Sequence, residues 1–574
     1  MGNKSIFIGS DDFCKIIEGG YYYVDKTLLA KKLIDRPAEV TLFTRPRRFG
    51  KTLNMMMLKA FFENIPGSSR YFENLKIWEC GEIYRKQQGK YPVIFLTFKD
   101  AKCNTWQETY EAICRLIQKE FNRHEMLGHF DGLNEYQRKQ VDKILNETAG
   151  AVVYKDALAD LTEYLHQTTG IRPMILIDEY DTPIMQGYEK GFGSEVTGFI
   201  RNLFSGGMKN NVHLERAVMT GILRIAQEDI FSGLNNIRVA TILDQEFSDC
   251  FGFTQEEVEE IAAYYHAEQK LGELREWYDG YWFGKTDIYN PWSVMNYFAA
   301  GCVPGTYWVS TSSNDIIQRC LVSPSAAMLQ SLSSLLNGDV IQEPVARNIA
   351  YGVIEGQGGE SVLYTLLLRS GYLCEAQGQP GGEEPAEAGL RNLKIPNREI
   401  EEVYRREIFE RLVQVSPSLS LYKVRQAVFS GDSQKIQTLF RELLLYNASF
   451  YDTASEGFYH ALVLGLLSCL GGNSRVYSNR ESGDGRYDLA LVDYAAKRGI
   501  LFEFKVIKTD TSSEKRIMEE LRRTAESAAI GQIDEKAYDV DLKKWGITKI
   551  EKYGAAFAKK FVAVRTGPAV FGAQ

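Results

Sequence analysis

A short basic turn in the sequence has the residue types of a phosphate-binding loop. In "FTRPRRFGKTL" (43–53), Gly50, Lys51 and Thr52 follow an apolar strand pattern and open a helical pattern. Backbone amides at a helix start attract phosphate oxygens. The lysine of such a loop reaches the outer phosphates, and the threonine hydroxyl holds Mg²⁺. Arg45 occupies the place of the loop's first glycine, so the motif alone fits either a nucleotide site or a chance basic turn.

A second stretch supplies the acids that a nucleotide site needs. "PMILIDEYD" (173–181) is an apolar run that reaches Asp178 and Glu179, which is typical of a strand with acids at its carboxyl end. Asp178 is expected to join the Mg²⁺ shell, and Glu179 to orient or deprotonate the attacking water. The alternative is a strand that ends in a solvated acidic turn. The phosphate-loop motif upstream favours the catalytic interpretation.

A third stretch, "RAVMTGILRI" (216–225), places Thr220 and Arg224 at the end of another apolar run. In a nucleotide site Thr220 would sense the γ-phosphate, and Arg224 would help to neutralise it. An arginine that follows a strand is more often a surface residue, so both interpretations of Arg224 stay open.

Three charged residues near the carboxyl end fit a metal-dependent phosphodiesterase. Asp488 lies at the start of one apolar run, "YDLALVD", while Glu503 and Lys505 interrupt the next, "GILFEFKVI". Because strand side chains alternate, Glu503 and Lys505 share one face. Charges inside an otherwise buried strand are costly unless they are used or paired. The alternative is an internal Glu–Lys pair at a sheet edge.

In the catalytic interpretation, Asp488 and Glu503 hold one or two Mg²⁺ or Mn²⁺ ions as hard oxygen ligands. Such ions lower the pKa of a bound water and stabilise charge on the scissile phosphate, while the lysine positions the water. Glu456 is a further candidate ligand, and His460 is expected to be structural. The glycine-rich hairpin "ESGDGR" (481–486) is expected to let a nucleic-acid strand approach closely.

Composition sets broad bounds on the chain. At 574 residues, with 44% hydrophobic and 25% charged residues, it reads as a multidomain globular protein. The net charge of -8 neither supports nor excludes a nucleic-acid partner, because a local basic groove can hide in an acidic average. Nine scattered cysteines without CxxC spacing indicate reduced thiols and a cytoplasmic location. No apolar run is long enough to span a membrane, so no membrane partner is expected.

The order of elements predicts three domains. Residues 1–240 alternate apolar runs with helical patterns, which predicts a doubly wound α/β fold with a largely parallel sheet. The clearest strands are expected at 39–44, 91–98, 173–178 and 216–221. Residues 241–395 are expected to form a helical domain, with a winged helix as one interpretation and a mobile loop at 375–390.

Residues 396–574 are expected to form a second, separate α/β unit. Its strands are expected at 474–479, 487–493 and 499–507.

These stretches occur together in one protein family. "GYYYVDKT", "TLFTRPRRFGKTLNMMML", "YPVIFLTFKD", "ILIDEYDTPI", "TGILRIAQEDIFSGLNN" and "WYDGYWFGKTDIYNPWSV" follow one another in order. With them the chain closely resembles the bacterial AAA-ATPase-like family, whose members usually end in a PD-(D/E)xK nuclease domain, here "GDGRYDLAL" and "FEFKV". The resemblance implies a P-loop NTPase domain and a restriction-endonuclease-like α/β domain. It also implies ATP and Mg²⁺ or Mn²⁺ as cofactors, and a nucleic-acid partner, DNA in preference to RNA.

The resemblance also bears on the arginines of the turn. In that family arginine takes the place of the first loop glycine, so Arg45 is expected to be a family feature. With Arg47 and Arg48 it would put three positive charges beside the phosphates. In related nuclease cores a glutamine and a tyrosine follow on the next helix, and Gln532 and Tyr538 are the candidates at a looser spacing.

We therefore expect an ATP-dependent nuclease in which the nucleotide state gates a metal-dependent phosphodiesterase, with a role in defence or mobile-element biology. One alternative is a nucleotide-regulated sensor whose last domain binds nucleic acid or protein without cutting. Another is an NTPase whose nuclease-like fold only scaffolds an assembly. The sequence does not decide between DNA and RNA or between endo- and exonucleolytic cutting. It also leaves open a homo-oligomer in which an arginine acts in trans.

Overall fold

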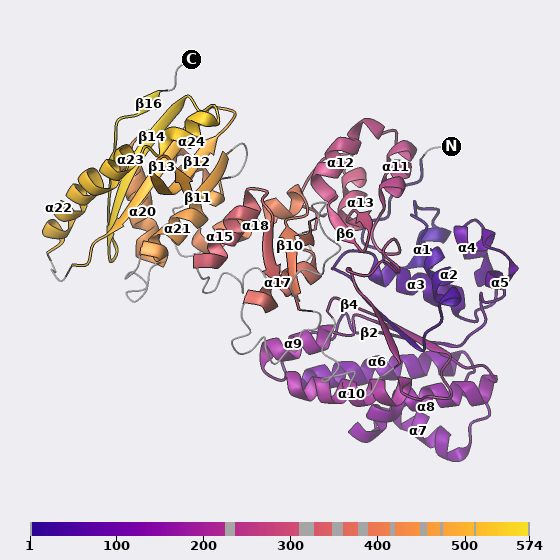
Figure 1. Cartoon of the computed structure of the whole chain (residues 1–574). Helices are drawn as coiled ribbons and strands as arrows, with labels where there is room; N and C mark the ends of the chain where they lie inside the picture. The colour runs from indigo at the N-terminus through magenta and orange to yellow at the C-terminus, as the bar shows by residue number, and fades with distance from the viewer. Residues whose placement is uncertain are drawn as a thin grey trace. The chain divides into compact units, whose positions relative to one another are not determined.

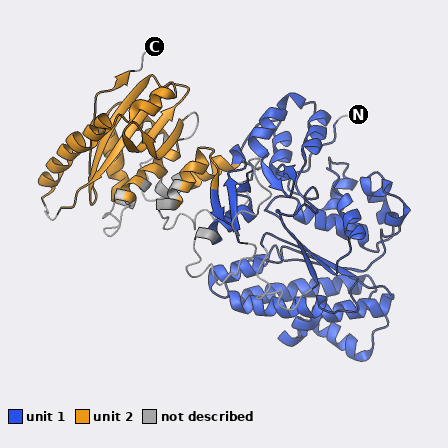
Figure 2. Cartoon of the chain, viewed as in Figure 1, with its two compact units in different colours: residues 1–312, 342–399 blue, residues 313–341, 400–574 orange. Residues whose placement is uncertain are grey.

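The chain divides into two compact units. In the computed structural model they are residues 1–312 with 342–399, and residues 313–341 with 400–574 (Figure 2). The structure describes residues 3–223, 236–308, 326–346, 360–376, 389–413, 420–447, 456–470, 474–509 and 513–571. Contacts thus join residues 241–312 to the first unit. The three-domain division with boundaries at 240 and 395 stays a prediction.

The first unit contains a five-stranded parallel sheet. Its strands are β1 (Val40–Thr44), β2 (Val93–Thr97), β3 (Met174–Asp178), β4 (Arg216–Gly221) and β5 (Ile237–Ala240), in the order β2-β3-β4-β1-β5. The first four coincide with the predicted apolar runs, and all four pairings are parallel, which confirms the predicted α/β class. Strand β5 was not predicted, because its four residues are mostly half-buried and form no clear apolar run.

Helices cover both faces of this sheet (Figure 1). Leu42 and Ile175 point toward the face covered by α6 (Trp106–Met126), α8 (Ala151–Thr169) and α10 (Gly193–Met208). Phe43 and Leu176, the neighbouring residues along the same strands, pack on the other face against α2 (Leu28–Asp35) and α3 (Lys51–Phe62). Strands that are buried on both faces explain the nearly continuous apolar runs.

The other described elements of the first unit are short. They are α1 (Phe13–Glu18), η1 (Ser68–Tyr71), α4 (Lys76–Glu79), α5 (Glu82–Arg85), α7 (Glu135–Leu145), α9 (Thr182–Lys190), α11 (Gln255–Tyr264), η3 (Glu268–Lys270), α12 (Leu271–Tyr278), β6 (Tyr281–Phe283), β7 (Thr286–Ile288), α13 (Pro291–Ala299), β8 (Ile341–Pro344), α17 (Glu360–Ser370), β9 (Cys374–Glu375) and β10 (Leu390–Lys394). The region from 241 to 395 is therefore not purely helical. A winged helix there stays a prediction, and residues 377–388 of the expected loop lie outside the described residues.

The second unit is built on a mixed sheet. Its strands are β11 (Ser474–Ser482), β12 (Gly485–Asp493), β13 (Arg498–Val506), β14 (Lys549–Ala558), β15 (Phe561–Thr566) and β16 (Val570–Phe571). The order is β11-β12-β13-β14-β15, with β16 also beside β14, and only the β13–β14 pair is parallel among the described strands. The first three strands match the predicted ones. Strand β14 was missed because charged and small residues fill "KIEKYGAAFA".

The second unit also contains several helices. They are α15 (Ala326–Leu336), α18 (Arg398–Val413, whose first two residues belong to the first unit), α19 (Leu421–Val428), α20 (Ser433–Asn447), α21 (Glu456–Ser468), α22 (Glu514–Thr524), η7 (Ala525–Ile530), α23 (Gly531–Glu535) and α24 (Asp539–Lys544). Phe502 packs on one face with α20 and α21, and Leu501 on the other with α23 and α24. Helix α15 packs on α21, where Ser468 donates to Ser333 at 3.2 Å. No helix in the described ranges is long and apolar enough to cross a bilayer.

Candidate active sites

The phosphate-loop turn lies between β1 and α3, as the motif predicts. Gly50 directly precedes α3, and its φ of 78° is left-handed. Arg48 is also left-handed, with φ of 69°. Two left-handed residues within three positions reverse the chain locally. The loop therefore turns at residues 48 and 50 and does not need glycine at position 45.

The amine of Lys51 is held inside this loop. Its Nζ donates to the carbonyl oxygen of Pro46 at 2.8 Å and to that of Arg45 at 3.1 Å. Burial lowers the pKa of Lys51, while the nearby Glu179 and Asp178 carboxylates oppose that effect. The ammonium is thus positioned by the turn itself and faces the acids of β3.

Asp178 joins the three stretches that the sequence analysis singled out for nucleotide chemistry. Its Oδ2 accepts a hydrogen bond from the Thr52 hydroxyl at 2.8 Å, and its Oδ1 accepts one from the Thr220 hydroxyl at 2.5 Å. Burial raises the pKa of Asp178. The strand order places β4 between β1 and β3, so the carboxyl ends of these strands meet at one edge. A threonine hydroxyl beside a buried aspartate is the donor set that holds Mg²⁺ in P-loop sites, so these residues fit such an ion.

Glu179 follows directly after β3 in a conformation that is uncommon outside glycine. Its φ is 53°, and its Oε2 accepts a hydrogen bond from the Thr182 hydroxyl at 3.1 Å. Left-handed backbone at a non-glycine residue costs about 1–3 kcal/mol and occurs often at functional sites. The side chain is half-buried, so the strained turn leaves this carboxylate partly accessible beside Asp178.

Tyr180 and Asp181, which follow Glu179, contact the residues at the end of β4. These contacts were not predicted from the sequence. Asp181 is buried, and its Oδ2 accepts from the backbone amides of Ile222 at 2.8 Å and Leu223 at 2.9 Å. The Tyr180 ring packs on Gly221, where a Cβ atom would lie 2.5 Å from it. The acid pair of β3 and the segment after Thr220 are therefore held as one body. Arg224, the candidate at that segment's end, lies outside the described residues.

Arg45 does not line the phosphate loop with its side chain, so our expectation of a phosphate contact has to be corrected. The residue is fully buried, and its guanidinium donates to the carbonyl oxygens of Thr44, Ala240 and Phe247 at 2.8–3.1 Å. The Phe251 ring lies 5.2 Å from the guanidinium carbon. Burial lowers the pKa of Arg45 to about 10. Three carbonyl acceptors stabilise the charge in the core, so that its role is to hold the strand ends together.

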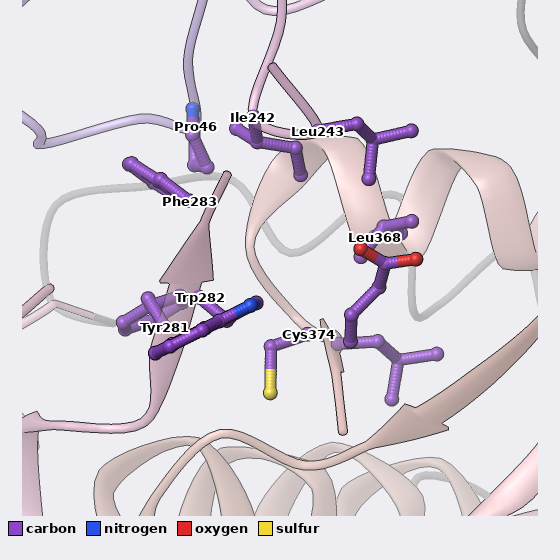
Figure 3. A pocket seen from close by; sticks show the side chains of 10 residues that line it. Pro46, Ile242, Leu243, Tyr281, Trp282, Phe283, Leu368 and Cys374 are labelled. Carbon is purple, nitrogen blue, oxygen red and sulfur yellow. The ribbon is translucent and has the colours of Figure 1, made fainter. Parts of the chain in front are cut away.

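Pro46 anchors the turn through apolar packing. Its ring lines a small pocket behind the loop (Figure 3). The other lining residues are Ile242, Leu243, Tyr281, Trp282, Phe283, Leu368, Leu373, Cys374 and Glu375. All of them come from residues 241–375, a region that the sequence analysis treated as a separate domain. That region therefore supports the phosphate loop directly.

Arg48 and Arg47 also contact residues of the region 241–375. The guanidinium of Arg48 lies 4.3 Å from the centre of the Trp292 ring, a cation–π contact. Burial lowers the pKa of Arg48, and Glu179 opposes that effect. The carbonyl of Arg47 accepts a hydrogen bond from the Trp308 indole at 3.4 Å. Arg48 is thus the loop arginine that lies near the acidic pair.

The second candidate site lies where β12 and β13 separate. Their ladder runs to the pair Leu489–Phe502, and the next residues along each strand are Asp488 and Glu503. The Oδ2 atom of Asp488 accepts a hydrogen bond from the Phe504 amide at 2.6 Å. Burial raises the pKa of Asp488. The predicted pair of acids is thus brought together on neighbouring strands.

Glu503 has the geometry of a cation ligand. It is only 1% exposed, and its Oε1 accepts from the Lys505 ammonium at 2.8 Å. Its Oε2 is buried without a hydrogen-bond partner among the described residues. Burial, together with the charge of Asp488, raises the pKa of Glu503 to about 7. A buried carboxylate oxygen without a partner needs a proton or a cation, so these residues fit a hard divalent ion.

The described residues offer two carboxylates at this site. Nowhere in the described ranges do three His, Cys, Asp or Glu side chains form a metal-binding group. Glu456 opens α21, and its side chain lies outside the described part. His460 Nε2 lies 3.0 Å from the carbonyl oxygen of Asp488 and 3.1 Å from the Ser478 hydroxyl. This contact with the strand backbone agrees with a structural part for His460.

Gln532 and Tyr538 contact each other despite their loose spacing, and Tyr538 lies near enough to the carboxylates to be affected by their charges. Gln532 donates to the Tyr538 hydroxyl at 2.9 Å. Burial raises the pKa of Tyr538, and the charges of Glu503 and Asp488 raise it further. Their match to the glutamine and tyrosine of related nuclease cores stays a prediction.

The glycines of the "ESGDGR" hairpin face the protein's own chain, which contradicts our expectation that they admit a nucleic-acid strand. A Cβ atom on Gly483 would lie 2.2 Å from the carbonyl oxygen of Lys536. One on Gly485 would lie 3.1 Å from the Tyr538 ring. The hairpin is also tied by the Ser482 hydroxyl, which donates to the carbonyl of Tyr538 at 2.8 Å. These glycines therefore serve close packing of the hairpin on the segment before α24.

Comparison with known proteins agrees with this geometry. Residues 7–231 match the family described as predicted AAA-ATPase, and residues 454–566 match the PD-(D/E)XK nuclease superfamily. A protein of Azotobacter chroococcum mcd 1, described as an uncharacterized protein in the vnfD 5' region, is 25% identical over 518 residues. That similarity covers 88% of this chain and 90% of the relative. The resemblance inferred from the motifs is confirmed.

Replacing Arg45 with alanine should destabilise the first unit. The change leaves three carbonyls unpaired in the core and opens a cavity, which we expect to cost about 3 kcal/mol or more. Thermal unfolding of Arg45→Ala measures the loss. Arg36→Ala, whose wild-type side chain is 66% exposed, is the matched control and should change little. Equal unfolding temperatures for the two variants would contradict a structural role for Arg45.

Divalent cations should stabilise the second unit through Glu503. Ligand at a hundredfold excess over Kd stabilises a folded protein by about 2.7 kcal/mol, so Mn²⁺ or Mg²⁺ should raise the unfolding temperature of the wild type. Glu503→Gln should remove that increase. Glu519→Gln, which changes an exposed acid on α22, should keep it. An increase that persists in Glu503→Gln would place the ion elsewhere.

Proposed function

We propose that this chain, whose residues 7–231 belong to the predicted AAA-ATPases and whose residues 454–566 belong to the PD-(D/E)XK nucleases, is an ATP-dependent nuclease. The nucleotide state of the first unit would gate phosphodiester cleavage, of DNA in preference to RNA, in the second. The observation that carries the nuclease assignment is the buried Oε2 atom of Glu503, beside Asp488 and Lys505, which has no hydrogen-bond partner among the described residues.

At the nucleotide site, each residue has a role that its contacts support. ATP with Mg²⁺ supplies the transferable phosphoryl group when bound. Lys51, held by the carbonyls of the turn, neutralises the outer phosphates. Thr52 and Asp178 would hold the cation through the hydroxyl and the carboxylate, which are hydrogen-bonded to each other in this structure. Glu179, beside them and partly accessible, orients the attacking water.

At the nuclease site, the carboxylates and the lysine divide the work. A divalent cation supplies a water of lowered pKa and stabilises phosphate charge when bound. Asp488 and Glu503 would hold that cation. Lys505 is 2.8 Å from Glu503 and 25% exposed at its side chain, so its ammonium lies next to the carboxylate yet within reach of a water. Lys505 would orient a water or the phosphodiester at this position.

A chain of hydrogen bonds supports gating. The Trp308 indole donates to the carbonyl of Arg47 in the phosphate loop, and the Trp308 amide donates to Glu399 Oε1 at 2.7 Å. The Ser293 hydroxyl donates to Glu399 Oε2 at 2.7 Å. Glu399 is the last residue of the first unit before the chain enters the second. A change in the phosphate loop therefore reaches the residue at which the chain leaves this unit.

Cleavage of a nucleic-acid panel tests the proposal. The wild type should cut DNA with Mg²⁺ or Mn²⁺ in an ATP-dependent manner, and Lys505→Ala should abolish cutting while ATP turnover continues. Lys51→Ala should abolish ATP turnover, and added ATP should then no longer change the rate of cutting. Trp308→Phe, which removes the indole donor but keeps an aromatic ring in the core, should keep both activities but uncouple them.

Two results would count against the proposal. Nucleic acid that is bound but never cut, under any nucleotide, would favour the sensor alternative. ATP-dependent cutting that survives Lys51→Ala would remove the gate. The panel includes RNA of matched sequence, so that the preferred substrate is read in the same assay.

Glu399 should make stability depend on pH. Burial raises the pKa of Glu399 to about 7, above the ordinary value of 4.5, so its stabilising protonated form is fully populated at low pH. This stabilisation is lost as the pH rises from about 4.5 through 7, and the wild type should lose roughly 1–3 kcal/mol. Glu399→Gln should lose less between pH 5 and 8 in urea unfolding. Parallel pH profiles for the two proteins would contradict the assignment.

A further inference from the structure

Tyr477 and Arg480 of the edge strand β11, one strand away from Asp488, form a cluster with Trp545, which directly follows α24. In the β11–β12 register, Tyr477 pairs with Ala490 and Arg480 with Tyr487. Asp488 therefore lies on β12 between Tyr487 and Ala490, the partners of these two residues. Neighbouring strands are about 4.8 Å apart, so the cluster begins next to the candidate catalytic site.

The cluster consists of Tyr477, Arg480 and Trp545, and we call it the arginine-aromatic edge. The rings of Tyr477 and Trp545 have centroids 4.7 Å apart. The Arg480 guanidinium lies 4.8 Å from the Trp545 ring centre and 5.5 Å from that of Tyr477. Half of the Arg480 side chain is exposed, at 49%, and both rings are half-buried. The planes of the two rings are tilted by 42°, so the three side chains form one contiguous flat-sided cluster that is partly open to solvent.

This edge lies on the same face of the sheet as the catalytic candidates. Tyr477 and Trp545 pack against the core that includes Leu501. Because strand side chains alternate, Glu503 and Lys505 follow Leu501 on that face.

Tyr538 joins the two groups. It belongs to the same core as Leu501, its ring centre lies 6.2 Å from that of Tyr487, and the charges of Glu503 and Asp488 act on its hydroxyl. A ligand held at the edge would therefore reach the carboxylates along one continuous face.

Charge at the edge is mixed. Asp541 lies 3.7 Å from Arg480 and 3.5 Å from Lys544, and Asp539 lies 2.5 Å from Lys543. Positive charge alone therefore does not select a partner here. The flat side chains select a partner by stacking, because bases stack on aromatic rings and on guanidinium planes. Paired bases inside a duplex do not expose their faces, so unpaired bases are favoured.

We propose that the arginine-aromatic edge binds unpaired nucleotides next to the cleavage site, which makes single-stranded segments or frayed ends the preferred substrates. This inference rests on the proposed nuclease function. Stacking contributes about 1–3 kcal/mol per base, so losing one stacked layer weakens binding roughly 5- to 150-fold. Blunt duplex, whose bases are covered, gains little from the edge.

Binding to Lys505→Ala full-length protein tests the inference without cleavage. A labelled single-stranded DNA oligonucleotide and its blunt duplex are titrated by fluorescence anisotropy at fixed salt. Adding Trp545→Ala or Arg480→Ala should weaken single-strand binding at least fivefold and change duplex binding less than twofold. Trp545→Phe, which keeps a ring, should retain most single-strand affinity. Tyr422→Ala, which removes an aromatic side chain 74% exposed on α19, should change neither.

The outcomes separate the inference from the function it rests on. Unchanged single-strand affinity in Trp545→Ala would overturn the inference, and the edge would then serve only to protect β11 from pairing with other chains. Equal losses for single strand and duplex would show an electrostatic effect and would also overturn it. If the wild type never cuts but Trp545→Ala still weakens single-strand binding, the proposed nuclease function would be wrong and the proposed binding surface would be supported.

Discussion

The first unit depends on one buried cation. The guanidinium of Arg45 donates hydrogen bonds to a carbonyl at the end of β1, one on β5 and one in the segment after β5, so two parts of the chain that are distant in sequence meet at one side chain. Without that charge their carbonyls would face each other in the core, which is costly. The phosphate loop starts at this residue. Its shape is therefore set by the core beneath it as much as by its own turn residues.

Both candidate sites contain a buried carboxylate on a strand of a sheet. Burial raises the pKa of Asp178 and of Glu503 alike, and each has a lysine on a neighbouring part of the chain. The sites differ in what satisfies the acid. Threonine hydroxyls donate hydrogen bonds to both oxygens of Asp178, whereas Oε2 of Glu503 accepts none from the part of the chain that the structure describes. The second site therefore has the stronger need for an added charge.

Sequence reasoning reached the strands and the acids because both follow simple rules. Continuous apolar runs marked β1 to β4, and the carboxyl ends of parallel strands must meet, which brought Thr52, Asp178 and Thr220 together. The direction of a side chain follows no such rule. Arg45 has the type of a phosphate ligand but turns into the core, and the hairpin glycines at 483 and 485 proved to be packing sites. Strand β14 escaped notice because its centre consists of small residues, which pack under η7 but form no apolar run.

The second unit is assembled from two separate stretches of chain. Residues 313–341 join residues 400–574, and the stretch between them belongs to the first unit, so the chain passes between the units three times. Helix α15 covers α21 only because of this arrangement. A fragment cut at residue 400 would expose the apolar side of α21 and lose the Asn337 side chain that pairs with both backbone groups of Val476 on β11. In evolutionary terms the second unit cannot be exchanged between relatives by replacing the carboxyl-terminal residues alone. Residues 313–341 and 400–574 have to be replaced together.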